Sequence, residues 1–122
     1  MTGMVTADGE AVIDLPIRGS GDQEIQVEAV IDTGFTGFLT LPKRLIDNLA
    51  LAFMGPTRAV LADGHEVSLD VFEAVVIWDD QEKSVPALAA EGSILVGMAM
   101  LAGYRVTLEM EDNGVVMIES LA

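Results

Sequence analysis

The sequence contains one short segment whose residue types suit acid–base chemistry. Asp32-Thr33-Gly34 directly follows the apolar run 29–31, so a carboxylate stands at the end of a predicted buried strand. A carboxylate in that position costs free energy unless backbone N–H groups, or a second carboxylate that shares a proton, satisfy it. Gly34 has no side chain and lets the backbone approach closely enough to donate such a bond. The pattern therefore favours a reactive carboxylate over an ordinary turn residue.

Two further segments that bear on the function follow this triplet along the chain. In the first, Ala62-Asp63-Gly64-His65 separates two runs of alternating apolar residues, 57–61 and 66–78, and Asp-Gly in that setting is a strong hairpin signal. Later in the chain, Ile94-Leu95-Val96-Gly97 is a second apolar run that stops at a glycine. The sequence thus predicts a long projecting hairpin between two buried strands that each end at a turn.

Together these segments resemble the signature of the retropepsin-like aspartic peptidases. In that family two apolar residues precede Asp-Thr-Gly, and two apolar residues and a glycine precede a short helix later on. Both halves are present here, and the resemblance spans about residues 10–119. The resemblance implies an all-β fold, which is a small closed barrel with one or two short helices. It also implies that the protein works as a homodimer.

The resemblance also implies roles for individual residues. Asp32 would be the catalytic carboxylate, Thr33 would brace the two active-site loops across the dimer, and Gly34 would orient the carboxylate and contact substrate. Ala62, Asp63, Gly64 and His65 would form the flap. Leu95, Val96 and Gly97 would form the second apolar motif with its structural glycine. The implied activity is that of an aspartic endopeptidase, a hydrolase without cofactor or metal.

The chemistry itself requires a second carboxylate. Peptide hydrolysis of this kind needs one carboxylate to activate water and a protonated one to donate to the carbonyl oxygen. Asp8-Gly9 and Asp63-Gly64 lack the threonine and stand in turn contexts, so one chain supplies one such residue. The partner is expected to be Asp32 of a second copy across a two-fold axis, where like charges share one proton. The predicted substrate is an extended peptide or protein segment.

Two residues depart from the family pattern and keep an alternative open. Phe35 stands where many relatives have alanine or a serine that bonds the carboxylate, and Met98 follows Gly97 where retroviral members carry arginine. The alternative is a catalytically inactive domain of this fold that acts as a dimeric peptide-binding or adaptor module. A one-sided scaffold domain is a further alternative.

The elements that must position these residues are mostly short strands. Period-2 alternation over 25–31 is typical of a strand with one buried face, and Pro42 suits the first turn of a helix. Asn113-Gly114 suits a type I′ hairpin turn. Helices are predicted at 43–49 and 98–102, and strands at 11–17, 23–31, 38–41, 57–61, 66–78, 83–89, 93–96, 104–110 and 115–119. Many short strands with little helix favour a barrel or sandwich.

Composition bounds the remaining possibilities. The 122 residues suffice for a single domain, 1–122, and 51% of them are apolar, as in a folded chain. A formal charge of -14 disfavours nucleic acid and anionic membrane as partners. The absence of cysteine and the single His65 exclude disulfides and multi-histidine metal sites. The apolar run 94–103 is too short to cross a bilayer, and the first residues lack a signal pattern, which predicts a cytoplasmic location.

Overall fold

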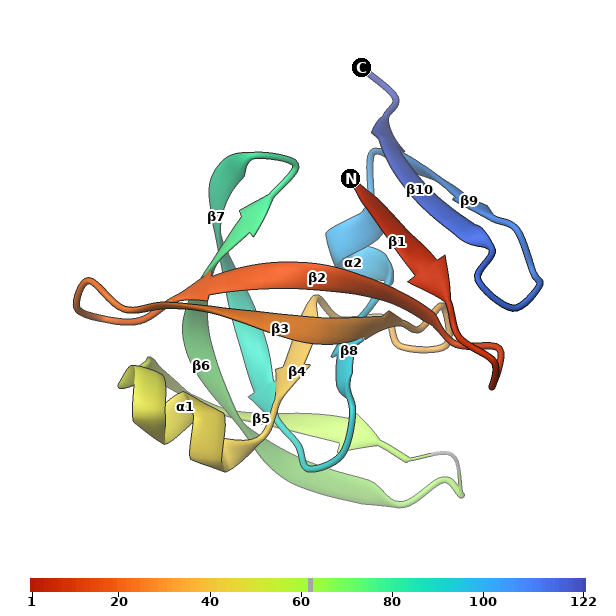
Figure 1. The fold of residues 1–122 in the computed structure, drawn as a ribbon. Coiled ribbons are helices and arrows are strands. Elements are labelled where there is room, and N and C mark those ends of the chain that lie inside the picture. Colours follow the sequence, from red (N-terminus) through yellow and green to blue (C-terminus); the bar gives the residue numbers. More distant parts are fainter. Residues whose placement is uncertain (62) are drawn as a thin grey trace.

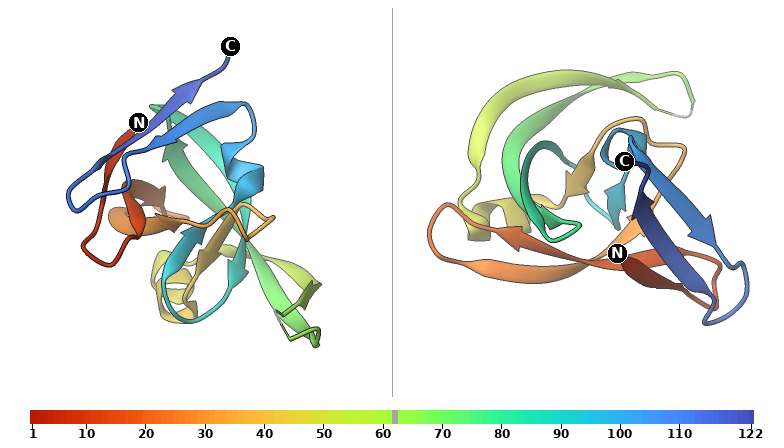
Figure 2. Two further views of the ribbon diagram at one scale, coloured as in Figure 1. Left: turned by 90° about the vertical axis from the view of Figure 1, so that its right-hand side faces the viewer. Right: turned by 90° about the horizontal axis from the view of Figure 1, so that it is seen from above.

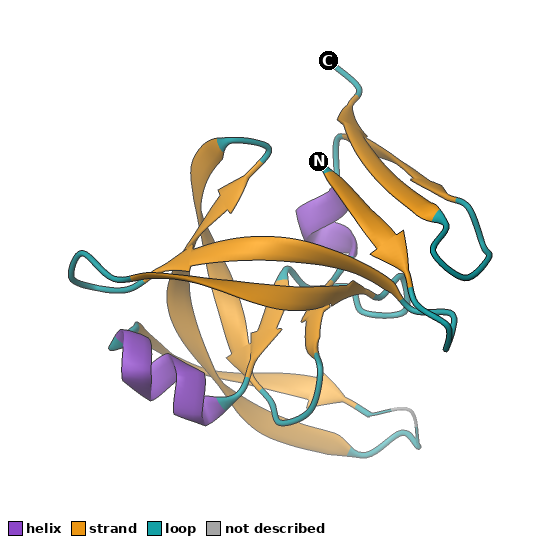
Figure 3. Cartoon of the chain, in the orientation of Figure 1, coloured by secondary structure: helices purple, strands orange, loops and turns teal. Residues whose placement is uncertain are grey.

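The computed structural model describes residues 1–61 and 63–122 and consists of strands with two short helices (Figure 3). The strands lie along the chain as follows: β1 Thr2–Val5, β2 Ala11–Arg18, β3 Glu24–Ile31, β4 Leu39–Leu41, β5 Ala52–Val60, β6 Glu66–Trp78, β7 Gln81–Ala89, β8 Ile94–Val96, β9 Tyr104–Leu108 and β10 Val115–Ser120. Helix α1, Lys43–Leu49, follows β4, and helix α2, Met98–Leu101, follows β8.

Six of these strands close into a barrel. Their order is β6-β7-β4-β8-β3-β2, and β2 pairs in turn with β6, so the ring has no free edge (Figure 1). The closing ladder is short and joins Ile17 to Val76 and Arg18 to Val75. The predicted all-β barrel with short helices is confirmed.

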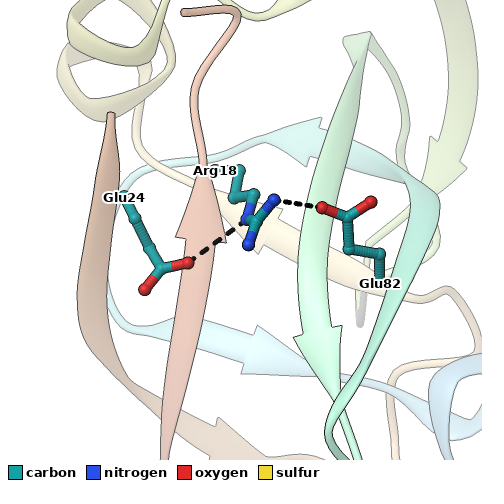
Figure 4. Close-up of polar contacts among 3 residues, drawn as sticks. All are labelled: Arg18, Glu24 and Glu82. Carbon is teal, nitrogen blue, oxygen red and sulfur yellow. Dashed lines mark hydrogen bonds and ion pairs between the residues drawn. The ribbon is translucent and has the colours of Figure 1, made fainter. Parts of the chain in front are cut away.

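Arg18 lies at the seam where the barrel closes. Its guanidinium donates from Nε to Glu24 on β3 at 3.2 Å and also contacts Glu82 on β7 (Figure 4). All three side chains are about half exposed, so each pair contributes roughly 0–1 kcal/mol. The arginine therefore joins β3 and β7 across β2 without supplying much of the stability.

The barrel interior is filled by alternate side chains of these strands. On β2, Ile13, Leu15 and Ile17 are at most 2% exposed, whereas the residues between them face outward. Trp78 at the end of β6 is also buried and meets Tyr104 edge to face, with ring centroids 5.9 Å apart. Burial of this size contributes about 1.5–3 kcal/mol for each large side chain and fixes the strand registers.

Three strands outside the ring extend the sheet. The strand β1 pairs with β2 on one side and β10 on the other, and β9 pairs with β10, so the order ends β2-β1-β10-β9. In both views of Figure 2 the β9–β10 hairpin stands apart from the hairpin formed by β5 and β6. The strand β1 and the first half of β5, 52–56, are found where no strand was predicted, and the other predicted elements are confirmed to within two residues at each end.

Among the described residues, neither helix has the length and apolar character needed to span a bilayer.

Candidate active site

Asp32 emerges from the centre of the barrel wall. The strand β3 pairs in parallel with β8, with Ile31 opposite Val96, and the N–H of Asp32 continues this ladder by donating to the carbonyl of Val96 at 2.9 Å. Asp32 is partly exposed and the next two residues are exposed. A carboxylate is thus held at the rim of a buried strand pair, as the sequence predicts.

The Gly34 backbone supports the carboxylate. Its N–H donates to Oδ1 of Asp32 at 2.9 Å, and a side-chain carbon at this position would lie 3.2 Å from the same oxygen. The Phe35 N–H bonds the Asp32 carbonyl at 3.2 Å and closes the turn. The predicted close approach of Gly34 is therefore present, and within the described residues no hydrogen bond is made to Oδ2.

The Phe35 ring lies against Gly37 and Gly97. An added Cβ at Gly37 would come within 2.6 Å of the Phe35 ring, and one at Gly97 within 2.6 Å of the ring and 2.3 Å of the Gly37 carbonyl oxygen. Three backbone bonds, from the N–H groups of Gly97, Met98 and Ala99 to the carbonyls of residues 38, 35 and 37, tie the two segments together. Both glycines make room for the ring and for this backbone crossing.

Thr40 joins β4 to β8 beside the crossing. Its side chain is 6% exposed, and its Oγ1 accepts the Leu95 N–H at 2.9 Å. The hydroxyl in turn lies 3.5 Å from the carbonyl of Ser93. Sequence reasoning assigned no role to Thr40, although a polar residue within the apolar run 38–41 was a usable signal.

A groove runs alongside the loop that carries Asp32. Its volume is about 660 Å³, and it lies between the loop 34–38 and the β5 segment 57–60, with Val71, Pro86 and Leu88 completing the lining. Asp32 and Thr33 border a second cavity of about 350 Å³ with Leu108 and Met110. The loop therefore separates two hollows, and Asp32 lies next to the smaller one. The alternating sequence pattern did not predict which residues line these two cavities.

The hairpin of β5 and β6 projects beyond the barrel and carries the predicted tip. In the left view of Figure 2 the loop after β3 lies between this hairpin and α2. Asp63 accepts the N–H of His65 at 3.0 Å and lies 2.8 Å from its ring Nδ1. The backbone bond and then the ring lower the pKa of Asp63 below its ordinary value. Gly64 has the left-handed φ of 87° that suits glycine, and Ala62 lies outside the described residues.

Thr33, which also borders the cavity beside Asp32, lines a third, apolar cavity. This cavity has a volume of about 370 Å³ and is lined by Thr33, Met98, Leu101, Tyr104, Val106 and the backbone turn 102–103. Its lining includes no charged residue. The structure thus brings Asp32, Thr33, Gly34 and Gly97 together. The hairpin that carries 63–65 reaches the same loop through residues 57–60 of β5, which line the groove with 34–38.

Comparison with known proteins identifies the fold. No family model and no curated protein matches the sequence. The structure is similar to a retropepsin-like aspartic protease from Rickettsia conorii, with a TM-score of 0.64 and 13% identity over 100% of this chain and 92% of that one. It is also similar to the Simian Foamy Virus (mac) protease, with a TM-score of 0.53 and 16% identity over 74% of this chain and 90% of that one. The closed barrel, the strand crossing below Asp32 and these two likenesses show that this chain has the retropepsin-like fold.

Proposed function

We propose that the protein is an aspartic endopeptidase whose active site forms between two copies of the chain. The observation that carries the proposal is the position of Asp32 at the partly exposed end of β3, with Oδ1 held by the Gly34 N–H at 2.9 Å. A carboxylate in this setting is accessible to water and fixed in orientation. The fold supports the same conclusion, because both structural neighbours are described as proteases.

The mechanism follows from pairing two such carboxylates. When the two Asp32 side chains lie side by side, repulsion between like charges makes them share one proton. The ionised member takes a proton from a water molecule, which attacks the peptide carbonyl carbon, while the protonated member donates to the carbonyl oxygen. The carboxyl group that took the proton from water then donates it to the leaving nitrogen. One hydroxyl of the diol intermediate returns its proton to the other carboxylate as the C–N bond breaks, which restores the shared proton. Each chain supplies one aspartate, so the homodimer is the active form.

The groove beside the loop offers room for the substrate. A volume of about 660 Å³ accommodates side chains of an extended peptide, and its lining by Phe35, Phe38, Val60, Val71 and Leu88 is largely apolar. The tip at Asp63-Gly64-His65 would act as a flap that covers the bound peptide and excludes water during the reaction.

The test is cleavage of an unstructured polypeptide. Wild-type protein and the Asp32→Asn variant, which has nearly the same shape, are incubated with reduced, unfolded casein, and products are identified by mass spectrometry. We expect cleavage by the wild type, inhibition by a statine-type compound, and at least a 1,000-fold loss in the variant. Equal cleavage by both proteins, or none by a correctly folded wild type, would rule out the proposal.

A dimeric peptide-binding module without activity is the second candidate. It is favoured by the Asp32 environment, because the described residues place the Gly34 N–H on Oδ1 and supply no side-chain donor to the carboxylate. Phe35, which follows Gly34, has no side-chain group that can donate a hydrogen bond. Peptide binding that is equal in the wild type and Asp32→Asn, without any product, would favour this candidate over the peptidase.

A further inference from the structure

The groove between the loop 34–38 and the β5 segment 57–60 differs in charge from the rest of the chain. The chain has 20 acidic and 6 basic residues, yet among the described residues no acidic one lines this groove. Arg58 is the single charged residue of the described lining, and the other lining residues are apolar, glycine or threonine. The carboxylates of this acidic protein therefore lie outside the hollow that the proposed function assigns to the substrate.

The Arg58 guanidinium is available to a ligand. Its side chain is 84% exposed, and its ion-pair partner Glu66 lies 3.7 Å from Nη1. That separation exceeds the roughly 2.7–3.2 Å of a hydrogen bond, so the pair is loose and screened by water. An arginine has five N–H donors in a planar fork whose geometry fits a carboxylate. Because no hydrogen bond within the described residues uses these donors, a carboxylate on a ligand can bind them.

A second cation lies against the apolar part of the lining. Phe38 lines the groove, and Nζ of Lys83 lies over its ring, 5.8 Å from the centroid. An ammonium at that distance is attracted by the negative face of the ring. No carboxylate of the described residues forms an ion pair with Lys83. Two of the few basic residues are therefore at this groove, one in its lining and one against a lining ring.

The groove has an apolar part and a charged margin. Its apolar part is partly buried and is formed by Phe35, Phe38, Val71 and Leu88. Arg58 stands on the exposed segment of β5 at the other side of the hollow. In an extended peptide, side chains two residues apart point to the same face and are about 6.5–7 Å apart. A peptide can thus place an apolar side chain in the hollow and a second side chain beside the guanidinium.

We infer that this groove recognises peptide segments that carry an acidic side chain close to an apolar one, and that Arg58 is the residue that determines this preference. The inference rests on the proposed function and adds a substrate class to it. The carboxylate of a glutamate or aspartate would accept two charge-assisted hydrogen bonds from the guanidinium. A glutamine of the same shape offers one carbonyl oxygen and no charge. The ratio between the two peptides therefore measures the contact with Arg58.

The net charge of the protein does not prevent such binding. At physiological ionic strength the screening length is about 8 Å, so acids farther than that from the groove act weakly on a bound carboxylate. A carboxylate at hydrogen-bond distance from the guanidinium interacts with it far more strongly. Glu66 is the acid that matters, because it is the ion-pair partner of Arg58 and competes for the same group. Glu66→Gln should therefore strengthen the preference for an acidic peptide.

The test uses peptides that differ at one residue. Overlapping casein peptides are made in pairs in which a single glutamate is kept or replaced by glutamine. For the wild type we expect kcat/KM to favour the glutamate member at least ten-fold in the pairs whose glutamate reaches Arg58. Arg58→Met, which keeps an apolar stem and removes the charge, should bring the ratio within two-fold. Arg58→Lys, which lacks the planar fork, should give an intermediate ratio.

Arg44→Met is the matched control. Arg44 is an exposed residue of α1 outside the groove lining, and its loss changes the net charge as much as the loss of Arg58 does. We expect the glutamate-to-glutamine ratio in this variant to stay within two-fold of the wild type. Equal falls in Arg58→Met and Arg44→Met would show a general effect of charge and would overturn the inference.

The outcomes separate this inference from the proposed function. Cleavage by the wild type without a glutamate preference in any pair overturns the role of Arg58 and leaves the peptidase standing. The same peptide pairs are also measured for binding to Asp32→Asn by fluorescence anisotropy, with and without Arg58→Met. An Arg58-dependent preference in binding, with no cleavage by the wild type, supports the inference and contradicts the peptidase. Absence of both binding and cleavage overturns both.

Discussion

At the scale of single residues, the candidate site depends on two glycines, which have no side chain, as much as on the larger residues around them. Gly37 and Gly97 lie against the Phe35 ring, and a Cβ on either would overlap it. The Phe35 ring therefore occupies the space that side chains at positions 37 and 97 would otherwise fill. The phenylalanine and the two glycines form one packing unit that holds the turn after Asp32.

Gly97→Ala tests this packing unit. The new methyl group would lie 2.3 Å from the Gly37 carbonyl oxygen, and because that neighbour is backbone, the loop itself must move. We expect a loss of about 1–3 kcal/mol in the free energy of unfolding, as for other overpacked sites, measured by urea denaturation at fixed protein concentration.

Gly21→Ala is the matched control for that substitution. Its added methyl would meet the end of the exposed Gln23 side chain at 3.1 Å. The Oε1 of Gln23 accepts the Gly21 N–H at 3.2 Å, so the contact can disturb one solvent-exposed hydrogen bond and no backbone neighbour. We expect a change within about 0.5 kcal/mol of the wild type. Equal losses at the two positions would show that Gly97 has no special role in the loop.

At the scale of elements, the site depends on the end of β3 and on two three-residue strands, β4 and β8, that meet below Asp32. The strand β8 pairs with both β3 and β4, and the Thr40 hydroxyl adds a side-chain bond to the Leu95 N–H at 2.9 Å. Strands of three residues make few backbone hydrogen bonds. The bond from the Leu95 N–H to the Thr40 hydroxyl is therefore a large share of the hydrogen bonds that hold β4 and β8 in place.

Thr40→Val removes that bond with little change of shape. The Leu95 N–H would lose its partner in a partly buried position, which costs about 1–3 kcal/mol. We expect lower unfolding stability and faster hydrogen exchange at the Leu95 amide. Thr2→Val, at an exposed position on β1, is the control and should change neither quantity. Unchanged exchange at Leu95 in Thr40→Val would contradict the bridging role.

The strongly patterned elements were predictable from sequence. Residues 66–78 alternate over a long run, and β6 begins and ends at the predicted residues. The strand β1 was missed because its pairing with β2 and β10 is decided by distant residues and its own residues show little pattern. The predicted type I′ turn was wrong: Asn113 has a positive φ of 64° and Gly114 does not. Gly114 is needed there because a Cβ would lie 1.8 Å from the Glu109 carbonyl oxygen.

The candidate site was predictable only in part. Asp32, Gly34 and Gly97 could be found because local sequence specifies a strand that ends in a turn. The third cavity, where Thr33 meets Met98 and Val106, forms from segments far apart in the chain, and no spacing rule brings them together. Residue type indicated the candidate carboxylate, and tertiary packing determines what surrounds it.

At the scale of the whole molecule, net charge opposes the proposed dimer. Each copy carries -14, so a pair carries -28 (2 × -14), and the acidic residues outnumber the basic ones by 20 to 6. Protonation of carboxylates lowers the negative charge on each copy and so weakens the repulsion between copies. Lowering the pH should therefore shift the equilibrium toward the dimer.

Sedimentation at two pH values measures this linkage. We expect a lower dimer dissociation constant at pH 5 than at pH 7.5 in low salt. Adding salt at pH 7.5 should remove much of the difference, because the screening length falls to about 8–10 Å near physiological ionic strength. An equal or tighter dimer at pH 7.5 in low salt would show that charge repulsion does not control assembly.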